Sequence, residues 1–573
     1  MTVALGLNFH HDTAACLIVD GRIVAAEEER WSGVKHNRTR RNDYLAAPTE
    51  ALRFCLDVAG VAPEEVGAVW AASMAPVPPT GSWASTERER LAGWLPPPLG
   101  ERLRLLSHHT AHILSGYPLA GVERAAGLVV DAGGSALGGD LAGRERISGF
   151  HLVPCGWERV HQQLPTYEPL AGDDKTRQGS VRHEHSLGHL YRNLAARAVL
   201  PGDEPEGSMM AMAALGAPDR FRAAVQELVT LEPSGRVHVR FPWGWYRPGG
   251  PLALGGLEWD RNEPQTERNR YDLAAAAQVV FEDAVVHVAA HLRAVTGADT
   301  LVFAGGCALN TRLNATLADR AGFTGLFVPP APHDAGTALG AALYGWCVDL
   351  GQTPPGPVTD ADWGPDPGTV APGLLERVAA SGAQVRTDLD HTELVDRVAA
   401  LLAEDRVLGW VQGRMEFGPR ALGHRSILAH PGSTATRDRV NAIKQRAPYR
   451  PLAPAVLSEH ASTYFAGEVD PFMNRTAIVR PEYRAALAGV VHADHSARVQ
   501  AVPSGHTGLA ELLRRFAART GTPVLINTSL NRKGTPIVRT GTDAVAAFDA
   551  LGLDALAVGT TLIERAHPGG TRR

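Results

Sequence analysis

The chain has 573 residues, and 56 Lys and Arg stand against 61 Asp and Glu, which gives a net charge of −5. Hydrophobic residues make up 44% and charged residues 20%, a composition typical of a globular protein with more than one core. The acidic balance excludes a general binder of nucleic acid or of anionic membranes. Only four of the basic residues are lysines, namely Lys35, Lys175, Lys444 and Lys533.

The first residues do not resemble a secretion signal, because they lack a basic segment and His10, His11 and Asp12 interrupt the apolar runs. No stretch reaches the roughly 18 consecutive apolar residues of a membrane helix. The five cysteines are scattered and form no C-x-x-C pair, which favours reduced thiols over a disulfide framework or a zinc-thiolate site. We therefore expect a soluble, cytoplasmic protein with no membrane partner.

Two similar β-rich units open the chain. Residues 3–9, 14–20 and 22–29 are short β-type runs, and Asp20-Gly21 predicts a two-residue hairpin turn. In the second unit, residues 126–134 predict a strand that ends on Asp131 and is followed by a turn with Gly133 and Gly134. Further strand signals extend to 151–153. The repetition predicts an α/β, duplicated, ATP-binding fold of the actin or hexokinase kind, in which Gly-rich turns bring backbone N–H groups to phosphate.

A long amphipathic helix is predicted at 271–295, and the strand after it ends on Gly305-Gly306 at the start of another helix. A fold of the actin kind would receive an adenosine here, although such a pair taken alone is more often an ordinary turn. Segment 351–373 contains 6 Pro and 5 Gly and is predicted to be a linker. The predicted domains are therefore 1–350 and 374–573, the second with a helix at 390–404, a strand at 406–412 and Arg-rich loops.

Four residues of the first domain suit a metal ion. His108 and His112 are separated by one helical turn and therefore face the same side, although polar surface histidines are the simpler interpretation. Asp131 and Asp334 each lie at a Gly-rich turn, where the carboxylates of a duplicated fold converge. Two histidines and two aspartates would suit Fe(II), Mn(II) or Zn(II), with positions left for substrate oxygens. A rival set, His183, His185 and His189, lacks paired aspartates at comparable turns.

Cationic residues gather in the second domain among Gly, Pro and aromatic residues. This pattern favours loops around a phosphorylated small molecule, which Arg side chains grip through two oxygens at once; a solvated basic face is the alternative. The strand-like segment 525–531 adds neutral donors, or else a local polar turn. The cationic residues are Arg414, Arg420, Arg425, Lys444, Arg446, Arg450 and Arg498, and the neutral ones are Asn527, Thr528, Ser529 and Asn531.

An ordered series of motifs resembles the antibiotic and nodulation-factor O-carbamoyltransferases along nearly the whole chain. The series includes HDTAA (11–15), EEERWSGVKH (27–36), HHTAH (108–112), VVDAGG (129–134), AGGCALN (304–310), HDAGTALGAAL (333–343), GRMEFGPRALGHRSIL (413–428), IKQRAPYRPLAP (443–454) and NTSLNRKGTPIV (527–538). One departure stands at Ser208 and Ala211, where the family usually has a lysine and a glycine.

The resemblance implies two half-reactions in two domains. A C-terminal YrdC-like domain would form carbamoyl-adenylate from Mg-ATP and carbamoyl phosphate, and an N-terminal domain similar to the tRNA threonylcarbamoyltransferase protein of the actin-like superfamily would transfer the carbamoyl group to a hydroxyl. A divalent metal, iron in related proteins, would be held by His108, His112, Asp131 and Asp334. The acceptor would be a secondary metabolite such as an antibiotic, through a sugar or polyketide hydroxyl.

The resemblance also distributes roles among the candidate residues. Catalysis falls to Lys444 and Arg498, and to His11 as the general base with Asp12 as its orienter. The expected carbamoyl phosphate ligands are Lys444, Arg446, Arg450, Arg498 and Arg420; the expected nucleotide contacts are Gly133, Gly134, Gly305, Gly306, Asn310, Asn527, Ser529 and Asn531. Small molecules are the expected partners, nucleic acid is not, and a homodimer stays open.

Two alternative functions and the interpretation of one aromatic segment remain to be considered. A tRNA threonylcarbamoylation enzyme is disfavoured by the acidic charge. A silent, actin-like nucleotide-binding protein has no need for Lys444, Arg450 and Arg498 together. The aromatic segment 241–260, with Trp243, Trp245 and Tyr246, either lines an acceptor pocket or packs on itself as a surface loop.

Overall fold

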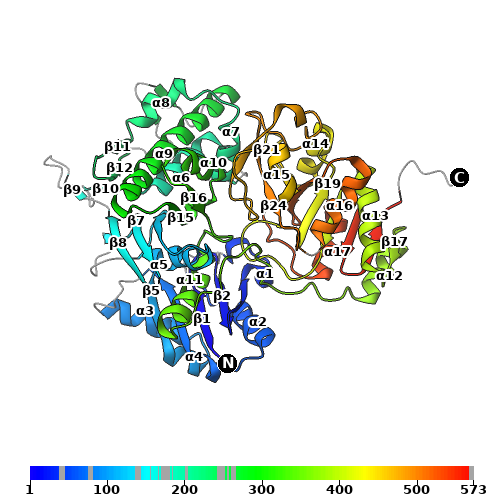
Figure 1. Ribbon diagram of the computed structural model, residues 1–573, viewed down its shortest axis with the longest axis horizontal. Helices are drawn as coiled ribbons and strands as arrows, with labels where there is room; N and C mark the ends of the chain where they lie inside the picture. Colours follow the sequence, from blue (N-terminus) through cyan, green and yellow to red (C-terminus); the bar gives the residue numbers. More distant parts are fainter. Residues whose placement is uncertain are drawn as a thin grey trace. The chain divides into compact units, whose positions relative to one another are not determined.

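The computed structural model describes most of the chain (Figure 1). The described residues are 1–37, 45–74, 82–135, 143–154, 156–164, 167–169, 181–183, 185–199, 204–241, 252–254, 257–259, 266–506 and 508–566. Lys175, Trp243, Trp245 and Tyr246 lie outside them. The described cysteines, Cys16, Cys55, Cys307 and Cys347, are free thiols.

The N-terminal runs build a five-stranded sheet in the order β3-β2-β1-β4-β5. Strands β2 (Ala14–Val19) and β3 (Arg22–Glu27) are joined by the predicted Asp20-Gly21 turn. Strand β1 (Val3–Asn8) pairs in parallel with β4 (Ala68–Ser73), which pairs in parallel with β5 (Leu103–Ser107). Nearly every residue of β1 and β4 is buried, as expected for central strands of an α/β sheet.

A second sheet repeats this topology. In the order β8-β7-β6-β15-β16, strands β6 (Ala125–Val130), β7 (Ile147–Val153) and β8 (Gly156–Gln163) are antiparallel neighbours. Strands β15 (Thr300–Ala304) and β16 (Gly325–Phe327) continue it in parallel with β6. Two sheets with three consecutive strands and two parallel crossover strands confirm the predicted duplication within an α/β fold (Figure 1).

Helices cover these sheets. The predicted long helix is α9 (Glu267–Thr296), which begins at an N-cap Thr266 whose side chain accepts a hydrogen bond from the Asn269 N–H. It is long and apolar enough to cross a membrane by length and composition, but 72% of its most apolar window is buried inside the protein. The other helices here are α1 (Glu29–Ser32), α2 (Thr49–Ala59), α3 (Ser82–Ala92), α4 (Pro97–Arg102), α5 (His108–Leu114), α6 (Leu187–Ala198), α7 (Pro205–Met212), α8 (Asp219–Gln226), α10 (Thr311–Arg320) and α11 (Gly336–Tyr344).

Three two-stranded sheets complete this part of the chain. They pair β9 (Tyr167–Pro169) with β10 (Val181–His183), β11 (Val229–Leu231) with β12 (Val237–Val239), and β13 (Leu252–Leu254) with β14 (Leu257–Trp259).

The C-terminal part contains an eight-stranded mixed sheet in the order β17-β27-β26-β18-β19-β25-β20-β24. Its strands are β17 (Gln384–Arg386), β18 (Leu408–Val411), β19 (Arg425–Ala429), β20 (Ala453–Leu457), β24 (Gln500–Val502), β25 (Val524–Ser529), β26 (Ala555–Val558) and β27 (Thr561–Glu564). Its helices are α12 (Pro372–Ala380), α13 (His391–Ala403), α14 (Thr434–Ile443), α15 (Ser458–Tyr464), α16 (Leu509–Thr520) and α17 (Gly541–Leu551), and a small sheet joins β21 (Phe465–Ala466), β22 (Thr476–Val479) and β23 (Ser496–Arg498).

The chain divides into two compact units that are not continuous in sequence. The first comprises Met1–His10, Ile18–Arg22 and Ala62–Pro357; the second comprises His11–Leu17, Ile23–Val61 and Val358–Arg573. Within the second unit, the Ala25 N–H donates to the Trp363 carbonyl (3.1 Å), and Arg30 donates to the Gly418 carbonyl (3.1 Å). The domain limits 1–350 and 374–573 stay a prediction.

The second half of the predicted linker is packed within the second unit. Arg425, which is fully buried, donates to the Pro365 carbonyl at 2.9 Å, and Arg414 donates to the Gly364 carbonyl at 3.0 Å. The segment has no helix or strand before α12. Its high Pro and Gly content therefore produces an irregular but anchored path rather than a free tether.

Candidate functional site

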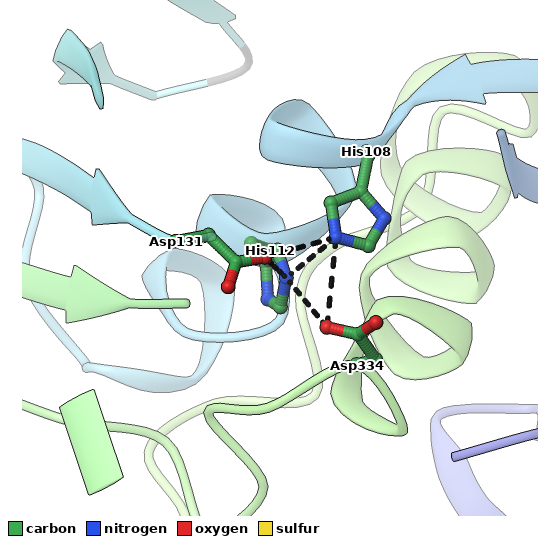
Figure 2. Close-up of side chains that lie close together, drawn as sticks. All are labelled: His108, His112, Asp131 and Asp334. Atoms are coloured by element: carbon green, nitrogen blue, oxygen red, sulfur yellow. Dashed lines mark hydrogen bonds and ion pairs between the residues drawn. The ribbon is translucent and has the colours of Figure 1, made fainter. Parts of the chain in front are cut away.

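The four predicted metal ligands converge at one place in the first unit. His108 and His112 lie on α5, directly after β5, and the Ser107 side chain caps this helix by accepting from the Thr110 N–H. Asp131 follows the last residue of β6, and Asp334 lies in the loop just before α11. Figure 2 shows the two imidazoles and the two carboxylates pointing toward one another from these separate elements.

The donor atoms have spacings that one metal ion requires. His108 Nε2 lies 3.0 Å from His112 Nε2, 3.3 Å from Asp131 Oδ2 and 3.6 Å from Asp334 Oδ1. His112 Nε2 lies 3.6 Å from Asp131 Oδ2 and 3.5 Å from Asp334 Oδ1. Tetrahedral ligands held about 2.1 Å from an ion are about 3.4 Å apart. These distances between donor atoms are therefore compatible with one tetrahedrally coordinated metal ion.

Close helix packing brings Asp334 to the histidines. A Cβ atom on Gly340 of α11 would lie 1.7 Å from the Ala111 carbonyl oxygen, and Ala111 stands between the two histidines on α5. A Cβ atom on Gly6 of β1 would likewise lie 2.0 Å from the Ala338 carbonyl oxygen of α11. The backbone of α11 thus contacts α5 and β1 directly, which no larger residue at 340 or 6 allows.

A buried carboxylate supports the ligand helix from behind. Glu145 is fully buried; it accepts hydrogen bonds from the Ser107 hydroxyl (2.9 Å) and the Ser135 N–H (3.0 Å), and forms an ion pair with Arg159 (2.9 Å). The Ser135 hydroxyl in turn accepts from the His108 N–H at 2.8 Å. Burial would raise the pKa of Glu145, but His109 and Arg159 lower it. Glu145 was not predicted from the sequence, because no periodic pattern or motif surrounds it.

The charges of the cluster call for a cation. Burial would lower the pKa of His108, but the Asp334 and Asp131 carboxylates outweigh it and raise this pKa to about 10. Burial would raise the pKa values of the two carboxyl groups, yet the histidines hold both well below the usual range. In the metal-free protein a proton bound to His108 therefore offsets one of the two carboxylate charges, and a divalent ion in its place would balance both.

The rival histidines do not form a comparable group among the residues that the structure describes. Only two sets of at least three ligand-type residues converge there: the cluster just described, and His11, Asp12 and His36. The rings of His185 and His189 lie 6.2 Å apart, and the His189 ring contacts the Ser186 hydroxyl at 2.9 Å. Burial lowers the pKa of His189 to about 4.

In the second unit, the charges of three arginines act on a fourth, the half-buried Arg498. Burial, together with the charges of Arg420, Arg446 and Arg450, lowers the pKa of Arg498 well below its usual range. The buried Nε of Arg498 has no hydrogen-bond partner, and no carboxylate among the described residues forms an ion pair with its guanidinium. A half-buried guanidinium with a buried donor to spare, close enough to other arginines to be affected by their charges, is suited to an anion with several oxygens.

Lys444 lies in the same region but is already bound by the protein. Its side chain is 3% exposed, and its Nζ donates to the Ser529 carbonyl (2.5 Å), the Asn531 carbonyl (2.8 Å) and the Asn531 side chain (2.5 Å). Arg446 donates to the Thr528 hydroxyl at 3.5 Å. Lys444 therefore fixes the end of β25 beside the arginines, and Ser529 and Asn531, predicted as nucleotide contacts, are the groups that it holds.

The remaining arginines and Asn527 of this region bind the protein's own backbone or side chains. Arg414 and Arg425 donate to carbonyl groups of residues 364 and 365. Asn527 is fully buried in β25 and donates to the Ala421 carbonyl (3.1 Å) and the Gln500 side chain (2.8 Å). In this structure these three side chains position the loops rather than face an open site.

The predicted nucleotide turns of the first unit lie around the metal cluster. A Cβ atom on Gly306 would be 3.0 Å from Asp131 Oδ1, and one on Gly134 would be 2.5 Å from the His109 ring. Gly305 has φ +96° and approaches the Val130 carbonyl. Gly133 lies beside Arg146, one step from Gly134. Gly133 and Gly134 thus follow β6 and Asp131, and Gly305 and Gly306 follow β15, at the strand ends where the duplicated fold predicted them.

Asn310 has a structural function in this structure. Its side-chain oxygen caps α10 by accepting from the Leu313 N–H (3.0 Å), and its side-chain nitrogen donates to Gln278 (3.0 Å). Ser208, which stands where the family usually has a lysine, is fully buried on α7, and its hydroxyl has no hydrogen-bond partner. The residues of the first unit that the structure describes include no lysine.

His11 and Asp12 are directly bonded, and a second histidine joins them. His11 Nδ1 lies 2.6 Å from Asp12 Oδ2, and His36 Nδ1 lies 2.6 Å from Asp12 Oδ1. From the sequence, His36 was recognised only as part of a family-like motif and was assigned no function. The motif EEERWSGVKH was the available signal, since it places a histidine among acidic residues.

Comparison with protein families identifies the class. A model described as the carbamoyltransferase N-terminus matches residues 160–343, and one described as the carbamoyltransferase C-terminus matches residues 399–565. Nodulation protein NolNO of Sinorhizobium fredii is 34% identical over 97% of this chain and 79% of its own length. The chain belongs to the carbamoyltransferase family and is a transferase enzyme.

Further relatives and solved structures complete the comparison. A 3'-hydroxymethylcephem-O-carbamoyltransferase of Amycolatopsis lactamdurans is 38% identical over 47% of this chain and 49% of its own length. A crystal structure of full-length HypF in a phosphate- and nucleotide-bound form is similar with 16% identity and a TM-score of 0.39, covering 59% of this chain and 55% of that one.

Proposed function

We propose that this enzyme is an ATP-dependent O-carbamoyltransferase that uses carbamoyl phosphate and modifies a hydroxyl group of a small secondary metabolite. The family supplies the carbamoyl transfer. The observation that carries the choice of donor is the half-buried Arg498, whose buried Nε lacks a partner and on which the charges of Arg420, Arg446 and Arg450 act. A phosphate dianion is the simplest ligand that neutralises such a cluster.

The first half-reaction would belong to the second unit. Carbamoyl phosphate, ATP and one water would give carbamoyl-adenylate, pyrophosphate and phosphate, so that the carbamate oxygen replaces pyrophosphate on the α-phosphorus. Arg498, with Arg420, Arg446 and Arg450, would bind the phosphate group. Lys444 would keep the β25 end in place and add positive charge beside the arginines.

The second half-reaction would use a metal ion held by the first unit. His108, His112, Asp131 and Asp334 would hold a divalent metal, Fe(II), Mn(II) or Zn(II), because their donor atoms are spaced for one cation and their carboxylates need one. When bound, the metal supplies Lewis-acid stabilisation of developing negative charge. The glycine turns at 133–134 and 305–306 lie beside the cluster, and their backbone N–H groups would contact the phosphates of a nucleotide.

The acceptor hydroxyl needs a base. His11 would take the hydroxyl proton on Nε2 while the hydroxyl oxygen bonds to the carbamoyl carbon and AMP leaves. Asp12 would orient His11 by accepting a hydrogen bond from its Nδ1, a task for which a separation of 2.6 Å is suitable. This arrangement leaves Nε2 as the basic nitrogen.

The acceptor class follows from the relatives. One of them is named for a hydroxymethyl cephem and another for nodulation, which supports a primary or sugar hydroxyl on a secondary metabolite. We expect neither nucleic acid nor a membrane to be required, and we expect action in the cytoplasm. We expect this chain, alone or as a homodimer, to carry out both half-reactions without another protein.

One experiment tests the proposal. The enzyme is incubated with ATP, carbamoyl phosphate and a panel of hydroxylated antibiotics that includes 3'-hydroxymethylcephem, and the products are followed by mass spectrometry and pyrophosphate detection. We expect AMP and pyrophosphate only when carbamoyl phosphate is present, and one panel compound that gains a carbamoyl group. Formation of ADP, or a requirement for tRNA, would contradict the proposal.

A further inference from the structure

One carboxylate joins the two elements that carry three of the four metal ligands. Glu145 is fully buried, and its Oε2 accepts hydrogen bonds from the His109 N–H of α5 (3.3 Å) and from the Ser135 N–H of the loop after β6 (3.0 Å). Helix α5 carries both histidine ligands, and the loop begins at Asp131. A single oxygen atom therefore links the histidine ligands to the loop of the aspartate ligand.

The first turn of α5 is held by side-chain acceptors that converge on this carboxylate. The first N–H groups of a helix have no partner within the helix, and here each finds a side chain: His108 N–H donates to the Ser135 hydroxyl (2.8 Å), His109 N–H to Glu145, and Thr110 N–H to the Ser107 side chain (3.4 Å). The Ser107 hydroxyl donates in turn to Glu145 Oε1 at 2.9 Å. The position of the first turn therefore depends on Glu145.

The ligand rings themselves have no such support. Metal-bound histidines usually donate their second ring nitrogen to a carboxylate, a carbonyl group or water, which fixes the ring. Nδ1 of His108 and Nδ1 of His112 are buried, and neither has a hydrogen-bond partner among the residues that the structure describes. Because that bond is missing, the position of both rings depends on where the backbone of α5 lies.

Close packing keeps Glu145 in place. A Cβ atom on Gly134 would lie 2.7 Å from Glu145 Oε2 and 2.5 Å from the His109 ring. The Gly134 N–H donates to the Glu145 carbonyl (2.8 Å), and the Glu145 N–H donates to the Ser135 carbonyl (2.9 Å). Arg159 forms an ion pair with Oε1 at 2.9 Å and balances the buried charge. The carboxylate is therefore a fixed acceptor.

We propose that Glu145 is a positioning residue that arranges the metal site before the ion binds. This rests on the proposed function, in which the cluster holds a divalent metal. Among His108, His112 and Asp131 the donor atoms already stand 3.0, 3.3 and 3.6 Å apart. A site arranged in advance binds its ligand more tightly, because no ordering of the protein opposes binding. Without the link through Glu145, α5 and the loop of Asp131 must be ordered by the ion itself.

The substitution E145Q tests the link with little change in size. Glutamine replaces one acceptor oxygen by an NH2 donor, which faces either the two N–H groups or the Arg159 guanidinium. We expect metal affinity to fall by about 10- to 100-fold. D272N is the matched control: Asp272 is also buried, accepts from the Ala217 N–H (2.8 Å) and pairs with Arg268, but it lies on α9, which carries no ligand.

Co(II) serves as the probe, because its visible absorption reports the coordination geometry. The metal-free enzyme is titrated with Co(II) in competition with a chelator. We expect the wild type and D272N to bind one equivalent with the intense bands of a four-coordinate ion, and E145Q to bind it more weakly and with weaker bands. Denaturant unfolding of the metal-free proteins should show that both variants lose stability, whereas only E145Q loses affinity, which separates positioning from a general loss of stability.

Two smaller changes keep the test decisive if E145Q does not fold. S107A removes the hydroxyl that donates to Glu145, and S135A removes the acceptor of the His108 N–H. Each should weaken Co(II) binding by about fivefold, the effect of one net hydrogen bond. Where E145Q folds, the loss in the E145Q/S107A double variant should be smaller than the product of the single losses, because the contribution of Ser107 runs through Glu145.

The outcomes separate this inference from the proposed metal site. A wild type that binds no Co(II), or an H112A variant that binds it as tightly as the wild type, would refute the metal site and this inference with it. With the ion located at the cluster, the inference alone is overturned by wild-type affinity in E145Q, by equal losses of affinity in E145Q and D272N, or by wild-type affinity in both S107A and S135A.

Discussion

Replacing Arg498 by methionine should stabilise the protein and abolish its response to phosphate. Arg498 is half-buried, its buried Nε has no hydrogen-bond partner, and the charges of Arg420, Arg446 and Arg450 act on it. Exchange of a fully buried ionic group for an apolar one of similar size stabilises proteins by about 1–4 kcal/mol, and the half-buried Arg498 should give a smaller gain. Phosphate at 100 times its dissociation constant should stabilise the wild type by about 2.7 kcal/mol, and the variant should gain nothing.

Denaturant unfolding with and without inorganic phosphate measures both effects. Without phosphate R498M should unfold at a higher denaturant concentration than the wild type; with saturating phosphate the two should become similar. The exposed Arg519 on α16 provides the control variant R519M, which should keep the wild-type phosphate response. The reasoning is refuted if R498M is less stable than the wild type in the absence of phosphate, or if phosphate stabilises both proteins equally.

Three more predictions concern the metal cluster and Lys444. Gly340→Ala should reduce bound metal, measured by elemental analysis, because its Cβ would displace the Ala111 carbonyl by overlap at 1.7 Å; the same change at the exposed Gly351 should leave bound metal unaltered. Since the metal-free pKa of His108 is raised to about 10, metal binding between about pH 7 and 9 should release one proton and its apparent affinity should rise with pH; calorimetry in buffers of different ionisation enthalpy measures this, and zero proton release would contradict it. Lys444→Ala should abolish carbamoyl-dependent pyrophosphate release and lower the free energy of unfolding by about 1–3 kcal/mol by leaving buried acceptors unsatisfied, whereas the exposed Lys533→Ala should do neither.

The strands, the duplication and the candidate metal ligands were predictable because they depend on local patterns. Apolar runs that end on Asp131 or on Gly305-Gly306 specify strand ends, and the spacing of His108 and His112 specifies one helix face. The convergence of Asp334 on these residues follows from the repeated topology. These features need no knowledge of how distant side chains pack.

Other features depend on packing, which the sequence does not encode locally. The position of Gly340 against Ala111, the support that Glu145 gives to α5 and the second bond from His36 to Asp12 each join residues far apart in the chain. From the sequence, Lys444 was expected to bind carbamoyl phosphate. A compact ammonium with three donors satisfies several carbonyl oxygens equally well, and only the folded structure shows that it does so here.

The discontinuous second unit has a consequence for the order in which the chain is made. Residues 23–61 pack with residues 358–573, through contacts such as that of Arg30 with the Gly418 carbonyl. At a synthesis rate of about 5–20 residues per second, the early segment waits roughly 15–60 s before its partners leave the ribosome. During that interval the hairpin strand β3 and helix α2 expose apolar surface. We therefore expect the nascent chain of this enzyme to require chaperones during synthesis.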